Sequence, residues 1–247
     1  MLENINKLEI YIFSAISGLS IMRKLNKNEY IELVAKSKVF EADSFGEKVL
    51  RFSDGNYMKL FRRKRLFSSA SFYPYWLRFV HNASKLKSLN VPTLRSVIEV
   101  VKVPHAKKTA VIYEPLPGFT VKQLLQKNSF NDELMKNLGT FIANLHKKGI
   151  YFSSLHLGNI VFTPKGDFGL IDITDLRTFP FAVPLFALKT NMRYLFQSRQ
   201  GLRLINDENK IAIFVSAYIK NITERNKTKM TDFLLTQRKT TLNQSKT

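Results

Sequence analysis

Residues 151–161 read Tyr-Phe-Ser-Ser-Leu-His-Leu-Gly-Asn-Ile-Val, and residues 168–172 read Phe-Gly-Leu-Ile-Asp. The apolar segments 160–162 and 168–172 flank the turn-rich stretch 163–167, which predicts two short strands joined by a hairpin turn. Such a hairpin allows Asn159, just before the first strand, and Asp172, at the end of the second, to face one site. An amide oxygen and a carboxylate are hard ligands that suit Mg²⁺. These two residues therefore offer oxygens that suit a metal, and the alternative is an ordinary turn Asn and strand-end Asp.

The segments around this hairpin have helical periodicity. A short helix is predicted around Val121 and Leu124, and a longer one ends at Gly149, which suits a left-handed helix cap. The apolar face of the longer helix is Leu134, Leu138, Phe141, Ile142 and Leu145. Two further helices are predicted near residues 185–197 and 208–222. The polar stretch 225–247 is interpreted as largely a loose tail.

The first half of the chain is predicted to be rich in strands. Segments 48–52 and 57–61 flank an Asp-Gly turn, which is a hairpin signal. A helix over 75–89 and strands over 95–103 and 109–113 follow, and the Pro- and Gly-containing stretch 114–118 breaks the pattern. The sequence thus predicts an α+β fold with two lobes, a small antiparallel sheet lobe (35–113) and a mainly helical lobe (114–224). Residues 1–34 would be a helical extension, and 225–247 the tail.

Composition limits the classes of function. The chain has 247 residues, no Cys and a net charge of +20. The lack of Cys excludes disulfides, thiolate zinc sites and a cysteine nucleophile. The charge predicts an anionic partner, and a peripheral membrane contact is expected through the basic run Arg62, Arg63, Lys64 and Arg65. The apolar segment 10–22 is too short to span a bilayer and is preceded by acidic residues, so a cytoplasmic protein without a signal peptide or transmembrane helix is expected.

The spacing of Asn159 and Asp172 resembles the core of the protein-kinase-like fold. Kinases carry a loop that ends in a metal-binding Asn and then a strand that ends in a metal-binding Asp. This resemblance implies ATP and Mg²⁺ as cofactors, with Asn159 and Asp172 as the metal ligands. Lys59 matches the lysine that contacts the nucleotide phosphates. The segment that includes Glu114 and Leu116 matches the hinge, whose backbone binds adenine.

A closer resemblance is to the bacterial lipopolysaccharide-core kinases that phosphorylate heptose or Kdo sugars, and especially to the toluene tolerance proteins. It covers roughly residues 35–220. The residues that carry it are Tyr73–Phe79, Asn90–Thr93, Tyr151–Phe152 and Leu155–Asn159. The resemblance implies that the acceptor is a sugar of lipopolysaccharide core or a similar anionic, lipid-linked glycan. It also implies a role in envelope integrity or solvent tolerance.

The chain departs from the kinase pattern at several positions. Ser154 stands at the position of the catalytic Asp, and a hydroxyl does not accept a proton near neutral pH as a carboxylate does. His156 stands where many kinases have a phosphate-contacting Lys. Three interpretations stay open: an ordinary loop histidine, a contact with phosphate, and acceptance of the substrate proton. Segment 42–46, at the place of the glycine-rich loop, has one Gly, and the helix over 75–89 has no Glu to pair with Lys59.

Two hypotheses therefore remain open, an active phosphotransferase with Ser154 and His156 at the catalytic position, and a catalytically inactive pseudokinase that binds nucleotide or acts as a scaffold. A third class, nucleic-acid binding, is suggested by charge alone, and no recognition motif supports a specific nucleic-acid partner. His146 is predicted to lie at a helix end, where a polar side chain suits the free carbonyls. His81 and His105 lack partners at zinc-ligand spacing.

Overall fold

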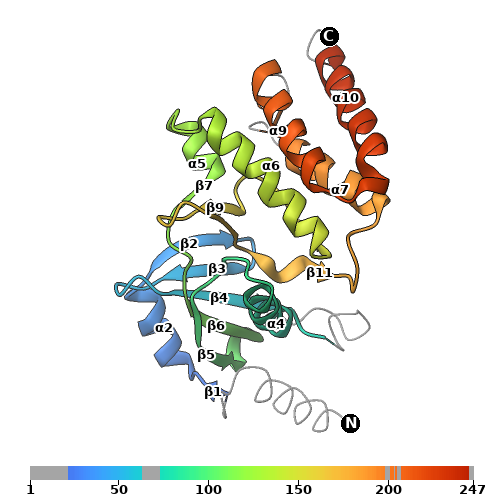
Figure 1. Cartoon of the computed structure of the whole chain (residues 1–247). Helices are drawn as coiled ribbons and strands as arrows, with labels where there is room; N and C mark the ends of the chain where they lie inside the picture. Colours follow the sequence, from blue (N-terminus) through green and yellow to red (C-terminus); the bar gives the residue numbers. More distant parts are fainter. Residues whose placement is uncertain (1–21, 63–72, 198–200, 203, 205–206, 245–247) are drawn as a thin grey trace. The chain divides into compact units, whose positions relative to one another are not determined.

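The computed structural model describes residues 22–62, 73–197, 201–202, 204 and 207–244, with side chains described as far as residue 237 (Figure 1). The chain is an α+β protein that divides into two compact units, with the boundary after Leu116. The sequence places the boundary a few residues earlier, after 113. Each unit is described separately below.

Unit 1 is built on a six-stranded sheet. Its strand order is β1 (Arg23–Lys24), β5 (Ser96–Val103), β6 (Lys108–Glu114), β4 (Tyr57–Arg62), β3 (Gly46–Arg51) and β2 (Lys38–Asp43). All neighbours are antiparallel except β1 and β5. The predicted hairpin corresponds to β3 and β4, and the two predicted strands after the helix correspond to β5 and β6. These sequence predictions are confirmed.

The two faces of this sheet follow from the alternation of side chains along β4. Met58 and Leu60 are buried in a cluster with Tyr30 of α2 (Lys27–Ala35). The intervening residues point to the other face, where Phe61 contacts Phe79 of α4 (Tyr75–Ser88), with ring centroids 5.7 Å apart. Lys59 therefore lies on the α4 side of the sheet.

The described part of the predicted N-terminal extension is an integral part of unit 1. Asn26 caps α2 in a capping box with Glu29, the two residues exchanging hydrogen bonds of 2.9 and 2.6 Å. Leu25 and Tyr30 are buried in the same core cluster as the sheet residues. Residues 22–34 are therefore packed on the sheet and do not form a separate extension. The apolar segment 10–22 lies outside the described residues except for Met22.

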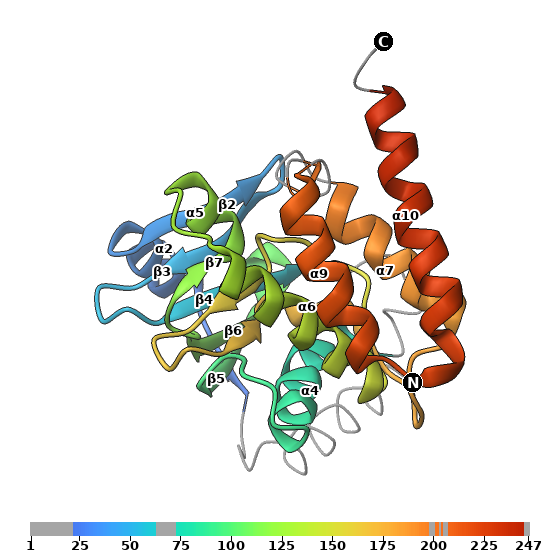
Figure 2. The ribbon, with the colours of Figure 1, turned by 45° about the horizontal axis from the view of Figure 1, so that its top comes forward.

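Unit 2 is mainly helical, with two small sheets (Figure 2). The sheets are β10-β9-β7 and β11-β8. The strands are β7 (Phe119–Thr120), β8 (Ile150–Phe152), β9 (Ile160–Phe162), β10 (Phe168–Leu170) and β11 (Leu176–Thr178). The helices are α5 (Val121–Gln126), α6 (Asp132–Lys147), α7 (Leu185–Gln197), α9 (Glu208–Asn221) and α10 (Lys227–Gln244). The predicted helices at 121–125, 134–145, 185–197 and 208–222 and the hairpin at 160–172 are confirmed.

The turn after α6 agrees with the sequence prediction. Gly149 has φ 77° and follows the last helical residues. A Cβ at this position would lie 2.4 Å from the carbonyl oxygen of Phe179. Glycine is therefore required both for the left-handed backbone and for the close approach of the neighbouring segment.

The prediction of a loose tail is wrong for residues 227–244, which form α10. Met230 and Leu234 are buried at helical spacing, and α10 packs against α7 and α9 (Figure 2). Among the side chains described on this helix, up to residue 237, the buried ones form one narrow stripe, which agrees with the polar composition of the segment. Tertiary packing of that stripe stabilises a helix that its own sequence does not favour.

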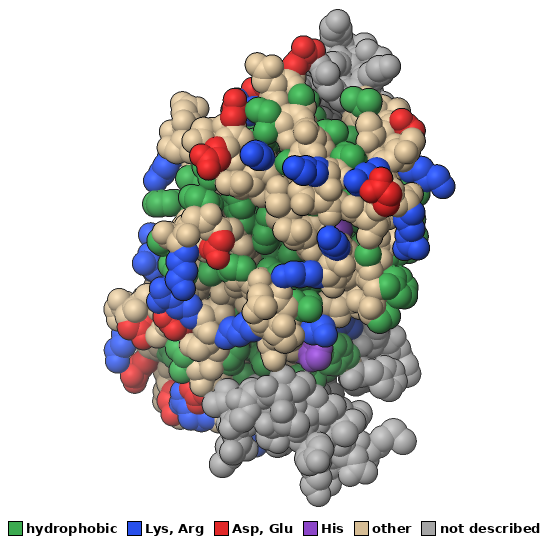
Figure 3. Space-filling model, in the orientation of Figure 1, with side chains coloured by type: hydrophobic (Ala, Val, Ile, Leu, Met, Phe, Trp, Pro, Cys, Tyr) green, Lys and Arg blue, Asp and Glu red, His purple; other side chains and the backbone are tan. Residues whose placement is uncertain are grey.

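On the face seen in Figure 3, Lys and Arg side chains are spread widely and outnumber Asp and Glu side chains. None of the helices in the described ranges is long and apolar enough to cross a membrane.

Candidate functional site

The loop 153–159 of unit 2 is anchored at its start by a buried amide. Asn191 of α7, which has no exposed surface, donates to the carbonyl oxygen of Phe152 at 3.0 Å and accepts from its N–H at 3.3 Å. These bonds hold the backbone at the end of β8. The loop that follows therefore begins from a fixed position in the core of unit 2.

A buried histidine holds Asn191 in turn. His146 Nε2 lies 3.2 Å from Asn191 Oδ1, and His146 Nδ1 lies 2.9 Å from the hydroxyl of Tyr218 on α9. Burial lowers the pKa of His146 to about 4, so the ring is neutral at pH 7. The prediction that the His146 side chain interacts with exposed carbonyls at the end of a helix is wrong. The side chain is buried in the core, where it contacts Asn191 and so helps to hold the amide that binds the start of the loop.

Asn159 closes the loop. It is buried, and its amide Nδ2 donates to the carbonyl oxygen of Ser154 at 3.0 Å. This bond fixes the orientation of the amide group. The amide oxygen Oδ1, an atom of the type that binds a metal, remains as an acceptor. Its own carbonyl oxygen accepts from the N–H of Ile171 at 3.0 Å. The backbone thus brings Asn159 next to the residue that precedes Asp172.

Asp172 has an unusual backbone conformation. Its φ and ψ are 54° and 45°, in the left-handed region that few non-glycine residues adopt. Asp tolerates this region better than most residues, and backbone strain is concentrated at functional sites. The side chain is exposed. The hairpin therefore ends with an exposed carboxylate on the residue directly after Ile171, whose N–H is bonded to Asn159.

His156 and Lys122 lie over the same backbone position. The N–H of Gly158 donates to His156 Nδ1 at 3.1 Å, so the neutral ring carries its proton on Nε2. A Cβ added at Gly158 would be 3.1 Å from His156 Nδ1 and 3.9 Å from Lys122 Cδ. The N–H of Lys122 also donates to the carbonyl oxygen of Leu157 at 3.0 Å, which ties α5 to the loop.

The electrostatics of His156 link it to Asp172. Desolvation by the packed side of the loop lowers the pKa of His156, the nearby charge of Asp172 raises it, and that of Lys122 lowers it. The net direction is downward, so the ring is neutral near pH 7. With Nδ1 engaged by Gly158, the ring offers a donor at Nε2. This geometry favours contact with an anionic group over the acceptance of a proton.

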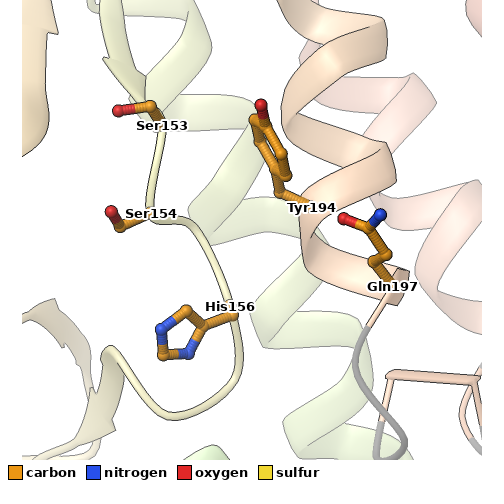
Figure 4. Close-up of a pocket in the computed structure, with 5 residues that line it drawn as sticks. All are labelled: Ser153, Ser154, His156, Tyr194 and Gln197. Carbon is orange, nitrogen blue, oxygen red and sulfur yellow. The ribbon is translucent and has the colours of Figure 1, made fainter.

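Ser154 lines an open pocket of about 310 Å³ with Ser153, His156, Tyr194 and Gln197. Tyr194 and Gln197 project from α7 towards the loop that carries the other three residues (Figure 4). The hydroxyl of Ser153 donates to the carbonyl oxygen of Asp175 at 2.9 Å. Most of the surface that the pocket exposes is apolar, although three of its five lining residues are Ser153, Ser154 and Gln197.

In unit 1, Lys59 lies in the middle of β4 between Val49 and Val111 of the neighbouring strands. Its ammonium lies 5.5 Å from the ring centroid of Phe79 and 5.7 Å from that of Phe61. Aromatic rings of β4 and α4 thus lie close to the amine. Cation–π attraction to these rings stabilises the charged amine.

The predicted adenine-binding segment is partly engaged within unit 1. The carboxylate of Glu114 accepts from Arg95 Nη1 at 2.8 Å, and this bond lowers the pKa of Glu114. The carbonyl oxygen of Glu114 accepts from the N–H of Arg95 at 2.9 Å. Leu116, the last residue of unit 1, is half-buried. The carbonyl of Glu114 is therefore already engaged within unit 1 by Arg95.

Two further predicted regions of unit 1 have local roles. The single-glycine segment 42–46 is a tight turn in which Asp43 pairs with Gly46 and accepts from the N–H of Phe45 at 2.8 Å. Arg62 stacks on Phe45 at 3.8 Å and forms an ion pair with Asp43 at 3.3 Å. The other residues of the basic run, Arg63, Lys64 and Arg65, lie outside the described residues.

The donor set at the hairpin fits Mg²⁺ in part. In the described ranges, no group of three or more His, Asp and Glu side chains forms a metal site by itself. One carboxylate and one amide oxygen, from Asp172 and Asn159, suit the way Mg²⁺ is usually held, with phosphates and waters supplying the remaining ligands. The fixed amide of Asn159 supports this fit.

The loop anchor and the pocket include residues that sequence analysis missed: Lys122, Asn191, Tyr194, Gln197 and Tyr218. They belong to helices that lie far from the loop in the sequence, and no local motif marks them.

A comparison with protein-family models finds no match, and a comparison with curated proteins finds no significantly similar chain.

Proposed function

We propose that the protein is an ATP-dependent phosphotransferase of protein-kinase-like fold. The observation that carries this proposal is the arrangement at the hairpin of unit 2. The amide of Asn159 is fixed by Ser154, and its backbone is bonded to Ile171, directly before the left-handed Asp172. This arrangement supports binding of Mg²⁺ with nucleotide phosphates. The resemblance of the sequence to lipopolysaccharide-core kinases supports a sugar hydroxyl as the acceptor.

The roles of the residues follow from their chemistry. Asn159 and Asp172 would hold Mg²⁺, which when bound neutralises charge on the phosphate oxygens. His156 would donate through Nε2 to a phosphate oxygen, and Lys122 and Lys59 would supply positive charge. The backbone near Glu114 and Leu116 would bind the adenine.

The reaction moves one phosphoryl group. The acceptor hydroxyl oxygen bonds to the γ-phosphorus, and the bond from that phosphorus to the oxygen bridging it to the β-phosphorus breaks. The electron pair of that bond leaves with ADP, and the hydroxyl proton of the acceptor passes to water. Phosphoryl transfer depends mainly on positioning and charge stabilisation, so the lack of a carboxylate at Ser154 lowers the rate without excluding the reaction.

The acceptor we propose is a sugar of lipopolysaccharide core or a similar lipid-linked glycan, with a role in envelope integrity or solvent tolerance. The net charge of +20 supports an anionic acceptor. The same charge supports peripheral contact with the inner face of the cytoplasmic membrane, at about 1 kcal/mol for each basic residue near an acidic surface.

The test of nucleotide binding is thermal stabilisation of the full chain by ATP with and without Mg²⁺. Asp172→Asn is the best variant, because Asn also tolerates the left-handed backbone while losing the charge. Asp175→Asn, three residues later, is the matched control. Stabilisation of wild type and the control, but not of Asp172→Asn, is the expected result. An absence of ATP-dependent stabilisation in wild type would refute the proposal.

A second candidate function is that of a pseudokinase that binds nucleotide without transferring phosphate. Ser154 favours it, because a hydroxyl stands at the position where the kinase pattern has the catalytic Asp. Transfer of labelled phosphate from ATP to purified lipopolysaccharide core distinguishes the two functions. Transfer that is lost in Asp172→Asn and retained in Asp175→Asn would eliminate the pseudokinase hypothesis.

A further inference from the structure

The segment that joins β11 to α7 carries apolar side chains on the surface of unit 2 (Figure 1). It reads Phe-Pro-Phe-Ala-Val-Pro-Leu-Phe over residues 179–186. Phe181 is 58% exposed, and Phe186, in the first turn of α7, is 71% exposed. The ring of Phe179 stacks on that of Phe181, with centroids 5.9 Å apart. Five residues span at most about 18 Å, so these three phenylalanines, named here the aromatic patch, lie within a short distance of one another.

Hydrogen bonds to the end of α6 hold this segment in place. The N–H of Phe179 donates to the carbonyl oxygen of Gly149 at 2.8 Å, and the N–H of Val183 donates to that of His146 at 2.8 Å. Val183 is buried. The backbone that carries the aromatic patch is therefore bonded to the core of unit 2, and its rings are exposed from a fixed position. Exposed apolar side chains of this kind mark a surface that contacts a membrane or another protein.

Exposed basic residues lie next to the aromatic patch. Lys147 and Lys148 are the two residues between His146 and Gly149, whose carbonyl oxygens bond the segment. Both lysines are exposed, and so is Arg177, two residues before the segment begins. The backbone bonds therefore place positive charge beside the exposed rings.

Negative charge is scarce around the same segment. Between Asp175 and Asp207 the sequence has five Lys or Arg residues and no Asp or Glu. The short helix η3 (Glu224–Asn226) lies beside Lys147, because both line one small cavity. The one carboxylate of this helix forms an ion pair with Lys227 at 2.7 Å. This part of unit 2 is therefore complementary in charge to an anionic surface.

We propose that the aromatic patch, together with Lys147, Lys148 and Arg177, docks unit 2 on a bilayer that contains acidic lipids. The rings enter the boundary between headgroups and acyl chains, and the basic side chains bind lipid phosphates. The combination favours a membrane over a protein partner. Lysine is depleted in protein interfaces, whereas basic and aromatic residues occur together on surfaces that bind membranes.

This inference goes beyond the proposed function, in which only the net charge supports contact with a membrane. It assigns the contact to named residues of unit 2, and it holds whether or not the protein transfers phosphate. The exposed phenylalanines add an apolar contribution that net charge does not supply, so salt should weaken the binding without abolishing it.

The first test is flotation of the full chain with vesicles of phosphatidylcholine and phosphatidylglycerol in equal parts. The double variant Phe181→Ala/Phe186→Ala should bind about tenfold more weakly, because two exposed rings are lost. Its thermal unfolding should match that of wild type, since neither ring is buried. Phe119→Ala is the matched control, because Phe119 is 50% exposed but lies on β7, in the other small sheet of unit 2. Equal binding by the double variant and wild type, or no binding by wild type, would overturn the proposal.

An added tryptophan tests whether the rings enter the bilayer. The single Trp of the chain, Trp76, is buried in unit 1. In Phe186→Trp the added indole fluorescence should shift to shorter wavelength on vesicle binding, and lipids brominated in the acyl chains should quench it. Phe119→Trp should show neither change. Vesicle-bound Phe186→Trp protein with unchanged fluorescence would refute insertion of the aromatic patch.

The basic residues are tested with the same vesicles and with vesicles of phosphatidylcholine alone. Lys147→Gln/Lys148→Gln should weaken binding to the acidic vesicles about 20-fold, at about fivefold for each lysine, and leave the weak binding to phosphatidylcholine unchanged. Lys136→Gln/Lys165→Gln removes the same charge at two other exposed lysines of unit 2 and is the control. Equal losses in the two double variants would overturn the assignment of Lys147 and Lys148.

The outcomes separate this inference from the proposed function. If ATP stabilises the protein but Phe181→Ala/Phe186→Ala binds vesicles as wild type does, the membrane surface is wrong and nucleotide binding stands. If vesicle binding depends on the aromatic patch and on Lys147 and Lys148 while ATP has no effect, the membrane surface stands and the phosphotransferase proposal fails.

Discussion

The two units differ in how they hold the residues that sequence analysis singled out. In unit 2, Asn159 and Asp172 are positioned by backbone hydrogen bonds, a left-handed residue and a loop anchored to buried Asn191. In unit 1, Lys59 lies against two aromatic rings, and Glu114 is paired with Arg95. The comparison teaches that hydrogen bonds to particular partners hold the loop and hairpin of unit 2. In unit 1, the Lys59 amine lies near rings that pack the sheet against α4. Ligand binding should therefore depend more on unit 2.

The largest effect is expected at Asp172. Asp172→Asn should reduce the affinity for ATP in the presence of Mg²⁺ by about 100-fold or more, because a charged metal ligand is lost. In the absence of Mg²⁺ the variant and wild type should differ little. Titration calorimetry with and without Mg²⁺ measures both. An affinity that Asp172→Asn leaves intact would contradict the importance of unit 2.

The buried network of unit 2 predicts a dependence of stability on pH. Between about pH 6.5 and 4 the unfolded chain binds a proton at His146 and the folded chain does not. Stability therefore falls as the pH falls through this window, and the His146 contribution at pH 5 should be on the order of 2 kcal/mol lower than at pH 8. Urea unfolding at the two pH values measures the change.

Two variants isolate this contribution. His146→Gln should be less stable at pH 8 and should lose most of the decrease between pH 8 and pH 5. His81→Gln, which removes an exposed histidine, should keep the wild-type decrease. The assignment to His146 is wrong if both variants show the same pH dependence as wild type.

Lys59 tests the contribution of unit 1. If it contacts the nucleotide phosphates, Lys59→Met should weaken ATP binding about tenfold, since one charge-assisted contact is lost. The Met side chain keeps the packing against Phe61 and Phe79. Lys85→Met on α4 is the control. An unchanged affinity for ATP would restrict the nucleotide site to unit 2 and would sharpen the difference between the units.

Lys122 tests whether unit 2 supplies a cation of its own. Its side chain reaches the same position over Gly158 as His156, so Lys122→Met should weaken binding of ATP about fivefold and of AMP very little. Lys165→Met, an exposed lysine in the turn between β9 and β10, is the control. Equal losses for ATP and AMP would exclude a contact with the terminal phosphates.

The smallest effect is expected at Glu114. Glu114→Gln removes a surface ion pair with Arg95, and surface ion pairs contribute little to stability. Because the backbone of this segment is proposed to bind adenine, the affinity for ATP should not change. Titration with ATP checks this, and a clear loss of affinity would show that the carboxylate itself contacts the ligand.

Much of the local structure could be predicted from the sequence. The hairpin around Asp54-Gly55, the face of α6 and the cap at Gly149 depend on periodicity and turn residues within a few positions of one another. Asn159 and Asp172 could be paired because one hairpin joins them. The helix α10 could not be predicted, because its composition is polar and, among its side chains described up to residue 237, only Met230 and Leu234 are buried.

The sequence by itself determined the α+β class, most of the strands and helices, and the proximity of Asn159 to Asp172, because each rests on local periodicity or on a short turn. Only the tertiary structure decided which side chains support the loop and line the pocket. His146 contacts Tyr218 across 72 positions and Asn191 across 45, and Tyr194 and Gln197 reach the pocket from α7. No local pattern encodes such contacts, because they form when helices distant in the sequence bury their apolar faces together.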